Sequence, residues 1–181
     1  MNCTIIKNEK LKILVCILFV LWILQLKAQE SKKTLKNNST MTEDINQIDP
    51  VFTNNKVQGS AEYFTGTVWI SPVLSKDKNN DFSIGNVMFE PQARTHWHTH
   101  PRGQVLLILA GKGFYQEEGK PARPISKGDI VNIPAHVNHW HGAAPDSKFV
   151  HIAITNYVEV VNVVWGKPVT DEEYKAAIKE Q

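Results

Sequence analysis

Cysteine is almost missing from this chain of 181 residues, and its two copies, Cys3 and Cys16, both lie close to the N-terminus. The remainder of the chain cannot form disulfides, so its stability has to come from an apolar core, a bound metal ion or oligomerisation. Long apolar stretches are scarce as well. The one extended run covers residues 13–24, whereas a helix that spans a bilayer needs about 20 apolar residues. The composition also excludes collagen-like, coiled-coil and wholly disordered classes.

The N-terminal segment has the composition of a secretory signal peptide. Lys7, Lys10 and Lys12 precede the apolar run, and Ala28 supplies a small residue behind it. We expect cleavage after Ala28, which removes residues 1–28, and export of the mature protein to the periplasm or the cell exterior. An N-terminal membrane anchor is the alternative, because Leu26 stands where a signal peptidase usually finds a small residue.

Cleavage would also change the charge of the protein. Residues 1–28 carry four lysines and one glutamate, so their removal changes the formal net charge from +2 to −1. The basic excess thus belongs to the export segment and gives no support to nucleic-acid binding. Once the signal peptide is gone, we expect no contact with a membrane.

Composition divides the remaining chain into three segments. Residues 29–59 are polar, which is typical of a linker or an extended arm. Residues 60–166 hold short β-prone runs separated by turn residues. The expected strands cover residues 63–70, 84–89, 105–109, 129–133, 149–157 and 158–165, with turns at 77–81, 111–113, 117–124 and 143–147. This pattern predicts an all-β fold with a single small antiparallel β-barrel. Residues 167–181 are expected to form a short C-terminal helix that Thr170 and Glu173 open as a capping box.

Histidine is absent from the first 95 residues, and all seven histidines lie between residues 96 and 151. His96, His98 and His100 alternate, so on a strand their side chains would share one face, about 6.5–7 Å apart. His139 and His141 repeat this spacing. Two imidazoles at positions i and i+2 can bind one ion, and neutral imidazole suits several divalent metals. The spacing therefore predicts a metal site.

The order of these residues resembles the cupin superfamily. The first cupin motif consists of His-x-His, an acidic ligand and a glycine, and its positions hold His98, His100, Gln104 and Gly111. The second motif consists of glycine, proline and histidine, and its positions hold Gly128, Pro134 and His139. The resemblance implies a jelly-roll barrel with a divalent metal ion. The metal ligands that it implies are His98, His100, Gln104 and His139.

Four positions depart from the general cupin pattern. Gln92 replaces the first glycine, and Gln104 replaces the acidic ligand. His136 stands in place of the glycine that follows the proline, and Ala143 in place of the last asparagine. We interpret His136 as a solvated loop residue.

A closer resemblance exists to the bacterial manganese-dependent cupin hydroxynitrile lyases, the group of the (R)-mandelonitrile lyases. It covers about residues 60–175 and rests on residues 64–68, 89–91, 93–95, 97–101, 103–104, 139–145 and 170–174. It implies an enzyme that cleaves or forms a cyanohydrin, with His151 as the base and His141 managing the cyanide or its proton. The pocket residues that it implies are His96, Gly85, Val87 and Thr155. Differences from the lyases at His96 and Thr155 leave the substrate open.

The ligand set favours a particular kind of ion. Three neutral imidazoles and the neutral amide of Gln104 leave the charge of the cation uncompensated, which makes it a stronger Lewis acid toward an oxygen ligand. An amide oxygen is also a hard ligand. We therefore expect Mn²⁺, with Fe²⁺, Zn²⁺ and Ni²⁺ as alternatives.

Other functions fit the same residues, because cupin barrels host many chemistries. A metal-dependent dioxygenase or isomerase is one alternative, and a non-catalytic module that binds a small ligand is another. In each case the expected partner is a small molecule. We also expect a homodimer or homotetramer, because edge-strand pairing would satisfy otherwise exposed backbone groups.

Overall fold

The computed structural model of this chain describes residues 22–25, 27, 29 and 55–179. Most of the expected signal peptide and linker lies outside these residues, so both stay predictions. The chain divides into two units, residues 1–44 and 45–181, and the strands described below all belong to the second. Within the described residues, no helix has the length and apolar character that a membrane span requires.

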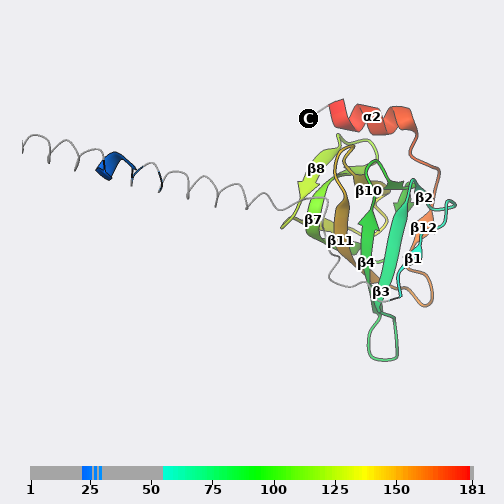
Figure 1. Ribbon diagram of the computed structural model, residues 1–181. Helices are drawn as coiled ribbons and strands as arrows, with labels where there is room; N and C mark the ends of the chain where they lie inside the picture. Colours follow the sequence, from blue (N-terminus) through cyan, green and yellow to red (C-terminus); the bar gives the residue numbers. More distant parts are fainter. Residues whose placement is uncertain (1–21, 26, 28, 30–54, 180–181) are drawn as a thin grey trace, which may run out of the picture. The chain divides into compact units, whose positions relative to one another are not determined.

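The second unit consists of short strands followed by one helix. In chain order the strands are β1 (Val57–Gln58), β2 (Phe64–Thr65), β3 (Val68–Leu74), β4 (Phe82–Phe89), β5 (Arg94–Thr95), β6 (His98–Thr99), β7 (Gln104–Glu117), β8 (Arg123–Ser126), β9 (Ile130–Ile133), β10 (His139–Ala143), β11 (Phe149–Asn156) and β12 (Val164–Trp165). The helix is α2 (Asp171–Lys179). The strands pair antiparallel in the order β1-β3-β4-β11-β7-β10-β5-β2 and curl into a small barrel (Figure 1). The predicted all-β fold with a short C-terminal helix is confirmed.

Strand β7 joins the two halves of the barrel. Its first residues pair with β11 and β9, and its last residues pair with β10 and β8. The strand bends near Gly111, where φ is 75°, and its register to β11 shifts just before, between the pairs Ile108–His151 and Ala110–Val150. A Cβ at this position would collide with the backbone carbonyl of Lys148, so glycine is required. The turn expected at 111–113 was therefore wrong: these glycines bend a continuous strand.

Three other strand predictions were wrong in their extent. The run at 63–70 is broken at Gly66 (φ 81°) into β2 and β3. In the run at 158–165 only β12 is a strand, because the chain folds back through a bridge between Val158 and Val161. The alternating histidines do not lie on one continuous strand either. Between β5 and β6 the backbone N–H of His96 donates to Tyr63 and that of Trp97 donates to Lys167.

Two of the positions that depart from the cupin pattern keep a left-handed backbone. Gln92 has a φ of 69° and His136 a φ of 63°, in a region that residues other than glycine rarely occupy. The local backbone shape that favours glycine is thus present although the glycines are not. His136 is exposed, as expected for a solvated loop residue.

Buried side chains form two clusters. The interior of the barrel is filled by a cluster that includes Phe64, Val68, Phe89, Leu106, Ile108, Val131, Ile133 and Phe149. A second cluster, outside the barrel, joins Trp97, Phe114 and Trp140 to residues of α2 such as Tyr174 and Ala177. Trp97 and Trp140 therefore pack toward the helix, while the histidines next to them in sequence are buried on the barrel side.

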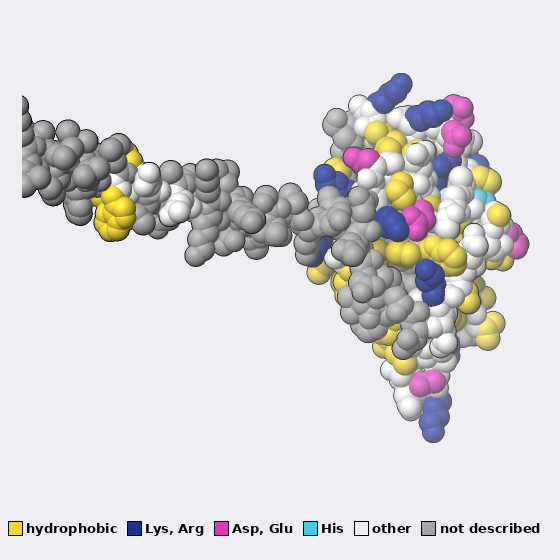
Figure 2. Space-filling model, in the orientation of Figure 1, with side chains coloured by type: hydrophobic (Ala, Val, Ile, Leu, Met, Phe, Trp, Pro, Cys, Tyr) yellow, Lys and Arg dark blue, Asp and Glu magenta, His cyan; other side chains and the backbone are white. Residues whose placement is uncertain are grey.

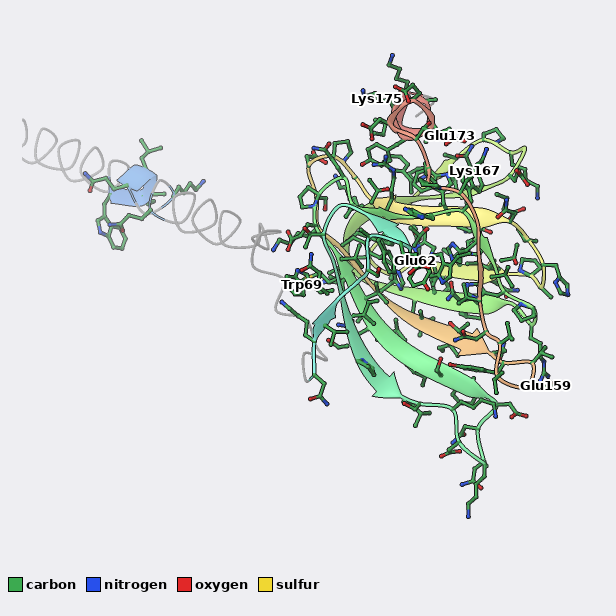
Figure 3. All side chains as sticks on the ribbon, turned by 90° about the vertical axis from the view of Figure 1, so that its right-hand side faces the viewer. Glu62, Trp69, Glu159, Lys167, Glu173 and Lys175 are labelled. Carbon is green, nitrogen blue, oxygen red and sulfur yellow. The ribbon has the colours of Figure 1, made fainter. Side chains whose placement is uncertain are left out.

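Helix α2 begins at the predicted capping box. The backbone N–H of Glu173 donates to the Thr170 hydroxyl (3.1 Å), and the backbone N–H of Thr170 donates to the Glu173 carboxylate (2.7 Å). Acidic side chains in the first turn favour the positive end of the helix dipole. Glu173 also lies 3.9 Å from Lys167, beside the start of the helix (Figure 3). The Tyr174 hydroxyl donates to the carbonyl of Ala143 at 2.6 Å, which ties the helix to the end of β10.

Candidate metal centre

Three histidines converge at the junction of β6, β7 and β10. His98 and His139 are direct cross-strand partners of β6 and β10, and His100 follows β6 immediately. Their ring centroids lie 4.1 Å (His98–His139), 5.0 Å (His98–His100) and 5.4 Å (His100–His139) apart. One ring nitrogen from each lies within 4.8 Å of the others, and all three side chains are buried. This geometry is compatible with one divalent metal ion.

Backbone carbonyls hold all three rings in the same way. The Nδ1 atoms of His98, His100 and His139 lie 2.9, 2.6 and 2.9 Å from backbone oxygens. These oxygens belong to His96, Asn162 and Val137. Because a carbonyl can only accept, each Nδ1 must carry the proton and donate. The Nε2 atoms are therefore the lone-pair nitrogens, and a carbonyl behind the far ring nitrogen is the usual support of a metal-binding histidine.

Gln104 brings an oxygen to the same region. It opens β7 and is the register partner of Thr155 on β11. Its Nε2 donates to the Thr155 hydroxyl at 2.8 Å, whereas its Oε1 is buried and has no hydrogen-bond partner among the described residues. The Nε2 atoms of His100 and His139 are buried and unpartnered in the same way. Buried acceptors are costly without a donor, and a bound cation would satisfy all three at once.

Burial keeps these imidazoles neutral. It lowers the pKa of His139 to about 4 and that of His98 well below its ordinary value of 6.5. The pKa of His100 is also lowered by burial, while the Asn162 carbonyl and the Gln104 side chain oppose that change. At neutral pH the three lone pairs are therefore available, as a metal ligand requires.

A second pair of histidines lies deeper in the barrel. His141 on β10 and His151 on β11 have ring centroids 5.0 Å apart, and the rings of Phe89 and Phe149 pack against His151. Burial lowers the pKa of His151 to about 3 and that of His141 well below 6.5. Neither ring nitrogen of His151 has a hydrogen-bond partner among the described residues, nor does Nδ1 of His141. His141 also lies 5.5 Å from His98, so it stands between the three-histidine group and His151.

Comparison with known proteins assigns this fold. The cupin domain family matches residues 85–155. An (R)-mandelonitrile lyase of Granulicella tundricola is 43% identical over 118 residues, which cover 65% of this chain and 90% of that enzyme. The chain belongs to the cupin family.

Solved cupin structures agree with this assignment. A cupin-like protein of Thermotoga maritima has 52% sequence identity and a TM-score of 0.62, and the match covers 66% of this chain and 91% of that protein. A predicted oxalate decarboxylase of the same organism shares the fold at 20% identity, with a TM-score of 0.53 over 57% of this chain and 92% of that one.

Three of the four predicted pocket residues lie on the strand face that carries His151. Val87 on β4 is the register partner of His151, and Gly85 pairs with Ala153. Thr155 follows two residues later on β11 and is buried. An added Cβ at Gly85 would meet no described atom within 4 Å. These positions therefore line one face, with free space next to Gly85.

His96 is placed differently. Its imidazole interacts with the backbone of Glu62, and it is not part of the group that converges around His98. Its backbone oxygen, however, is the acceptor for the His98 ring. The expectation that its side chain crowds the face of His98 and His100 depended on a regular strand, which ends at Thr95.

Several contributors to the site could not be found from the sequence. The backbone carbonyls of Asn162 and Val137 leave no signal in the sequence, because every residue has a backbone carbonyl. Trp165, at the end of β12, packs its ring 4.8 Å from that of His98, and it was predicted only as part of a strand. The Phe89 and Phe149 rings beside His151 were likewise expected only as strand residues.

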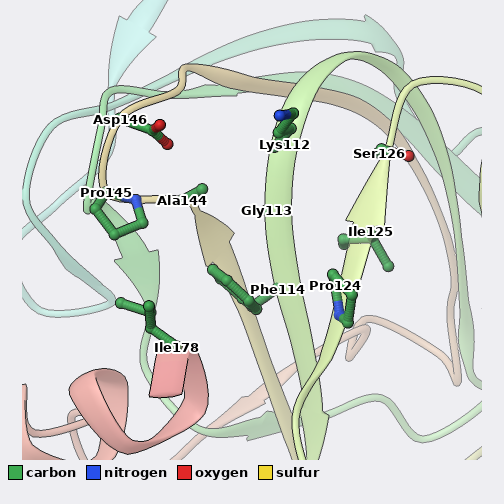
Figure 4. Close-up of a pocket in the computed structure, with 10 residues that line it drawn as sticks. All are labelled: Lys112, Gly113, Phe114, Pro124, Ile125, Ser126, Ala144, Pro145, Asp146 and Ile178. Atoms are coloured by element: carbon green, nitrogen blue, oxygen red, sulfur yellow. The ribbon is translucent and has the colours of Figure 1, made fainter. Parts of the chain in front are cut away.

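The histidine group does not line the surface cavity beside α2. That cavity, of about 720 Å³, lies between α2 and the strands β7 and β8 (Figure 4). It is lined mainly by apolar side chains such as Phe114, Ile125 and Ile178. The histidines are instead enclosed within the barrel, and little histidine surface is visible on the face in Figure 2.

Proposed function

We propose that this cupin is a metal-dependent lyase that cleaves or forms a cyanohydrin or a related small hydroxyl or carbonyl compound. The observation that carries the proposal is the set of buried acceptors that face one point without donors, on His100, Gln104 and His139. The 43% identity to an (R)-mandelonitrile lyase supports the reaction type.

His98, His100, Gln104 and His139 would hold the ion, for which we propose Mn²⁺. When bound, the ion would supply Lewis acidity that lowers the pKa of a substrate hydroxyl. Three neutral nitrogens and one neutral oxygen would leave its positive charge uncompensated, and the hard amide oxygen favours manganese over thiolate-seeking metals.

His151 and His141 would move the protons. A neutral ring nitrogen of His151, without another hydrogen-bond partner, is free to accept the proton of the substrate hydroxyl. The bond between the carbinol carbon and cyanide then breaks, its electron pair leaves with cyanide, and a carbonyl group forms. His141, whose ring lies 5.0 Å from that of His151, would give its proton to cyanide and take up the proton held by His151, so that hydrogen cyanide leaves and both rings are neutral again.

We expect the bound ion, rather than an arginine or a lysine, to hold the substrate oxygen. The charged groups that act on His98 and His141 are other histidines of the same group. Arg94, the nearby buried cation, is bound to Asp171 at 2.7 Å and to the Val169 carbonyl. A cyanohydrin would bind the ion through its hydroxyl oxygen and needs no cationic side chain.

A metal-dependent dioxygenase is the second candidate. An acireductone dioxygenase of Alcanivorax borkumensis is 32% identical over 62 residues, although these cover only 33% of this chain and 34% of that enzyme. Bound iron and consumption of oxygen with a substrate would favour this candidate over the lyase.

The deciding experiment is cyanide release from racemic mandelonitrile by the purified protein loaded with Mn²⁺, compared with the same protein stripped by a chelator. Metal-dependent release that favours one enantiomer would establish the lyase activity. Release no faster than that of the stripped protein would reject the lyase and leave the dioxygenase to be tested with Fe²⁺ and an oxygen electrode.

A further inference from the structure

The side chain of Gln104 has two different ends, and only one of them can bind a cation. The amide oxygen is a ligand, whereas the NH₂ group is a donor with no lone pair to offer. A rotation of the amide by about 180° exchanges the two ends without moving the strand. Strand pairing alone thus places Gln104 at the site but does not decide which end faces the histidines.

The contact that holds the amide comes from the opposite strand. A hydroxyl can accept from the NH₂ end or donate to the oxygen, and a cation beside the histidines would favour the first arrangement. Thr155 is the register partner of Gln104, and its hydroxyl accepts the hydrogen bond from Nε2 at 2.8 Å. Both side chains are buried, 7% exposed for Gln104 and 6% for Thr155, so water does not readily replace this bond. With the NH₂ end occupied by Thr155, the oxygen is the end left for the ligand group.

The position of the oxygen is costly without a cation. Oε1 is buried without a donor, and the Nε2 atoms of His100 and His139 are in the same state. Several acceptors facing one another repel unless a positive charge lies between them.

We propose that Thr155 is a positioning residue for the metal centre, which holds the Gln104 amide with its oxygen toward His98, His100 and His139. This inference deepens the proposed function, because it depends on metal binding at these residues. This role of Thr155 is separate from lining the substrate pocket, because Thr155 acts on the metal through Gln104 and needs only its hydroxyl group to do so.

The test is metal affinity, measured by competition with a chelator for Mn²⁺ and Zn²⁺ on the full chain. Thr155→Val keeps the shape and the β-branched side chain but removes the hydroxyl, and we expect affinity to fall about tenfold, the lower end of the effect of losing an outer contact to a ligand. Thr155→Ser keeps the hydroxyl and should stay within about threefold of the original protein. Thr155→Ala is a second deletion of the hydroxyl, in case the valine packs poorly.

A Gln104→Glu background separates orientation from general damage. Both ends of a carboxylate are oxygens, so the ligand no longer needs to be oriented, and adding Thr155→Val there should change affinity by less than about threefold. Equal affinities for the original protein and Thr155→Val, or a tenfold loss in both backgrounds, would overturn the inference while metal binding itself stands. Failure of the original protein to bind either metal would overturn the proposed function together with the inference.

Discussion

The two groups of histidines in this barrel share burial and a lowered pKa but differ in how their rings are held. In the outer group, His98, His100 and His139, a backbone carbonyl fixes Nδ1 of every ring. In the inner pair, neither ring nitrogen of His151 nor Nδ1 of His141 makes a well-formed hydrogen bond to the described residues, and the backbone of Ile152 opposes the effect of burial on the His151 pKa only in part. The outer rings are therefore fixed in one tautomer, and His151 is restrained by packing against Phe89 and Phe149 instead.

We propose that this difference corresponds to two roles, metal binding by the outer group and proton transfer by the inner pair. A ligand must present the same lone pair continuously, so a fixed tautomer is an advantage. A residue that accepts and releases a proton needs a ring nitrogen that is open to the substrate, and neither ring nitrogen of His151 has a hydrogen-bond partner among the described residues. Buried histidines could thus serve either role. The groups packed around each ring, backbone carbonyls in the outer group and aromatic rings beside His151, would determine which one.

The largest expected effect is the loss of turnover with metal binding retained. His151→Ala should lower turnover of a cyanohydrin about 10²–10⁴-fold, the usual contribution of a general base, while metal affinity stays unchanged. His139→Ala should abolish both, because it removes a ligand. Turnover follows from cyanide release, and metal content from elemental analysis after gel filtration.

The matched control for both variants is His136→Asn. His136 is exposed and has a φ of 63°, a conformation that asparagine tolerates, so neither metal content nor turnover should change. Loss of metal from His151→Ala would contradict its assignment as the base and would join the inner pair to the ligand group.

A smaller effect should appear in the pH dependence of stability. The pKa of His151 is about 3 in the folded protein and about 6.5 when unfolded. Below pH 6.5 the unfolded chain binds a proton that the folded protein does not, so stability is complete above this pH and falls as the pH falls toward 3. Between pH 7 and pH 5 the contribution of His151 is a loss of about 2 kcal/mol.

This loss can be isolated in chelator-stripped protein by denaturant unfolding at the two pH values. His151→Gln removes the titrating group and should reduce the loss between pH 7 and pH 5 by about 2 kcal/mol. An unchanged pH dependence in His151→Gln would mean that the folded protein accommodates the charged ring, contrary to its apolar surroundings.

The sequence was sufficient to predict the barrel, the C-terminal helix and the residues that converge. The spacing of His98, His100, Gln104 and His139 matched the cupin motifs. The first three of these residues are close together in the sequence, so their proximity in the fold follows from local chain order. The cross-strand pair of His98 and His139 joins positions 41 apart, which only the resemblance to a family could anticipate.

Other features depended on tertiary structure and were therefore missed. The continuous strand assumed for His96, His98 and His100 is broken, because the N–H groups of His96 and Trp97 bond to Tyr63 and Lys167. The carbonyls behind the ligand rings come from segments far apart, such as Asn162 for His100. The bend at Gly111 was interpreted as a turn, because glycine has the same preference in both settings.

The smallest expected effect concerns a region that belongs to neither histidine group. Thr170→Ala removes the hydroxyl that caps α2 at the backbone N–H of Glu173, and loss of such a cap costs about 1 kcal/mol. The helix contacts β10 at two places: the Tyr174 ring lies 6.0 Å from that of Trp140, and the Tyr174 hydroxyl donates to the carbonyl of Ala143. Tyr174 and Trp140 belong to the cluster outside the barrel, on the opposite side of the strand from the histidine rings. We therefore expect denaturant unfolding to show this loss while metal affinity and turnover remain unchanged. A parallel fall in metal affinity would mean that α2 holds β10 in place, and that the outer group relies on the helix as well as on its backbone carbonyls.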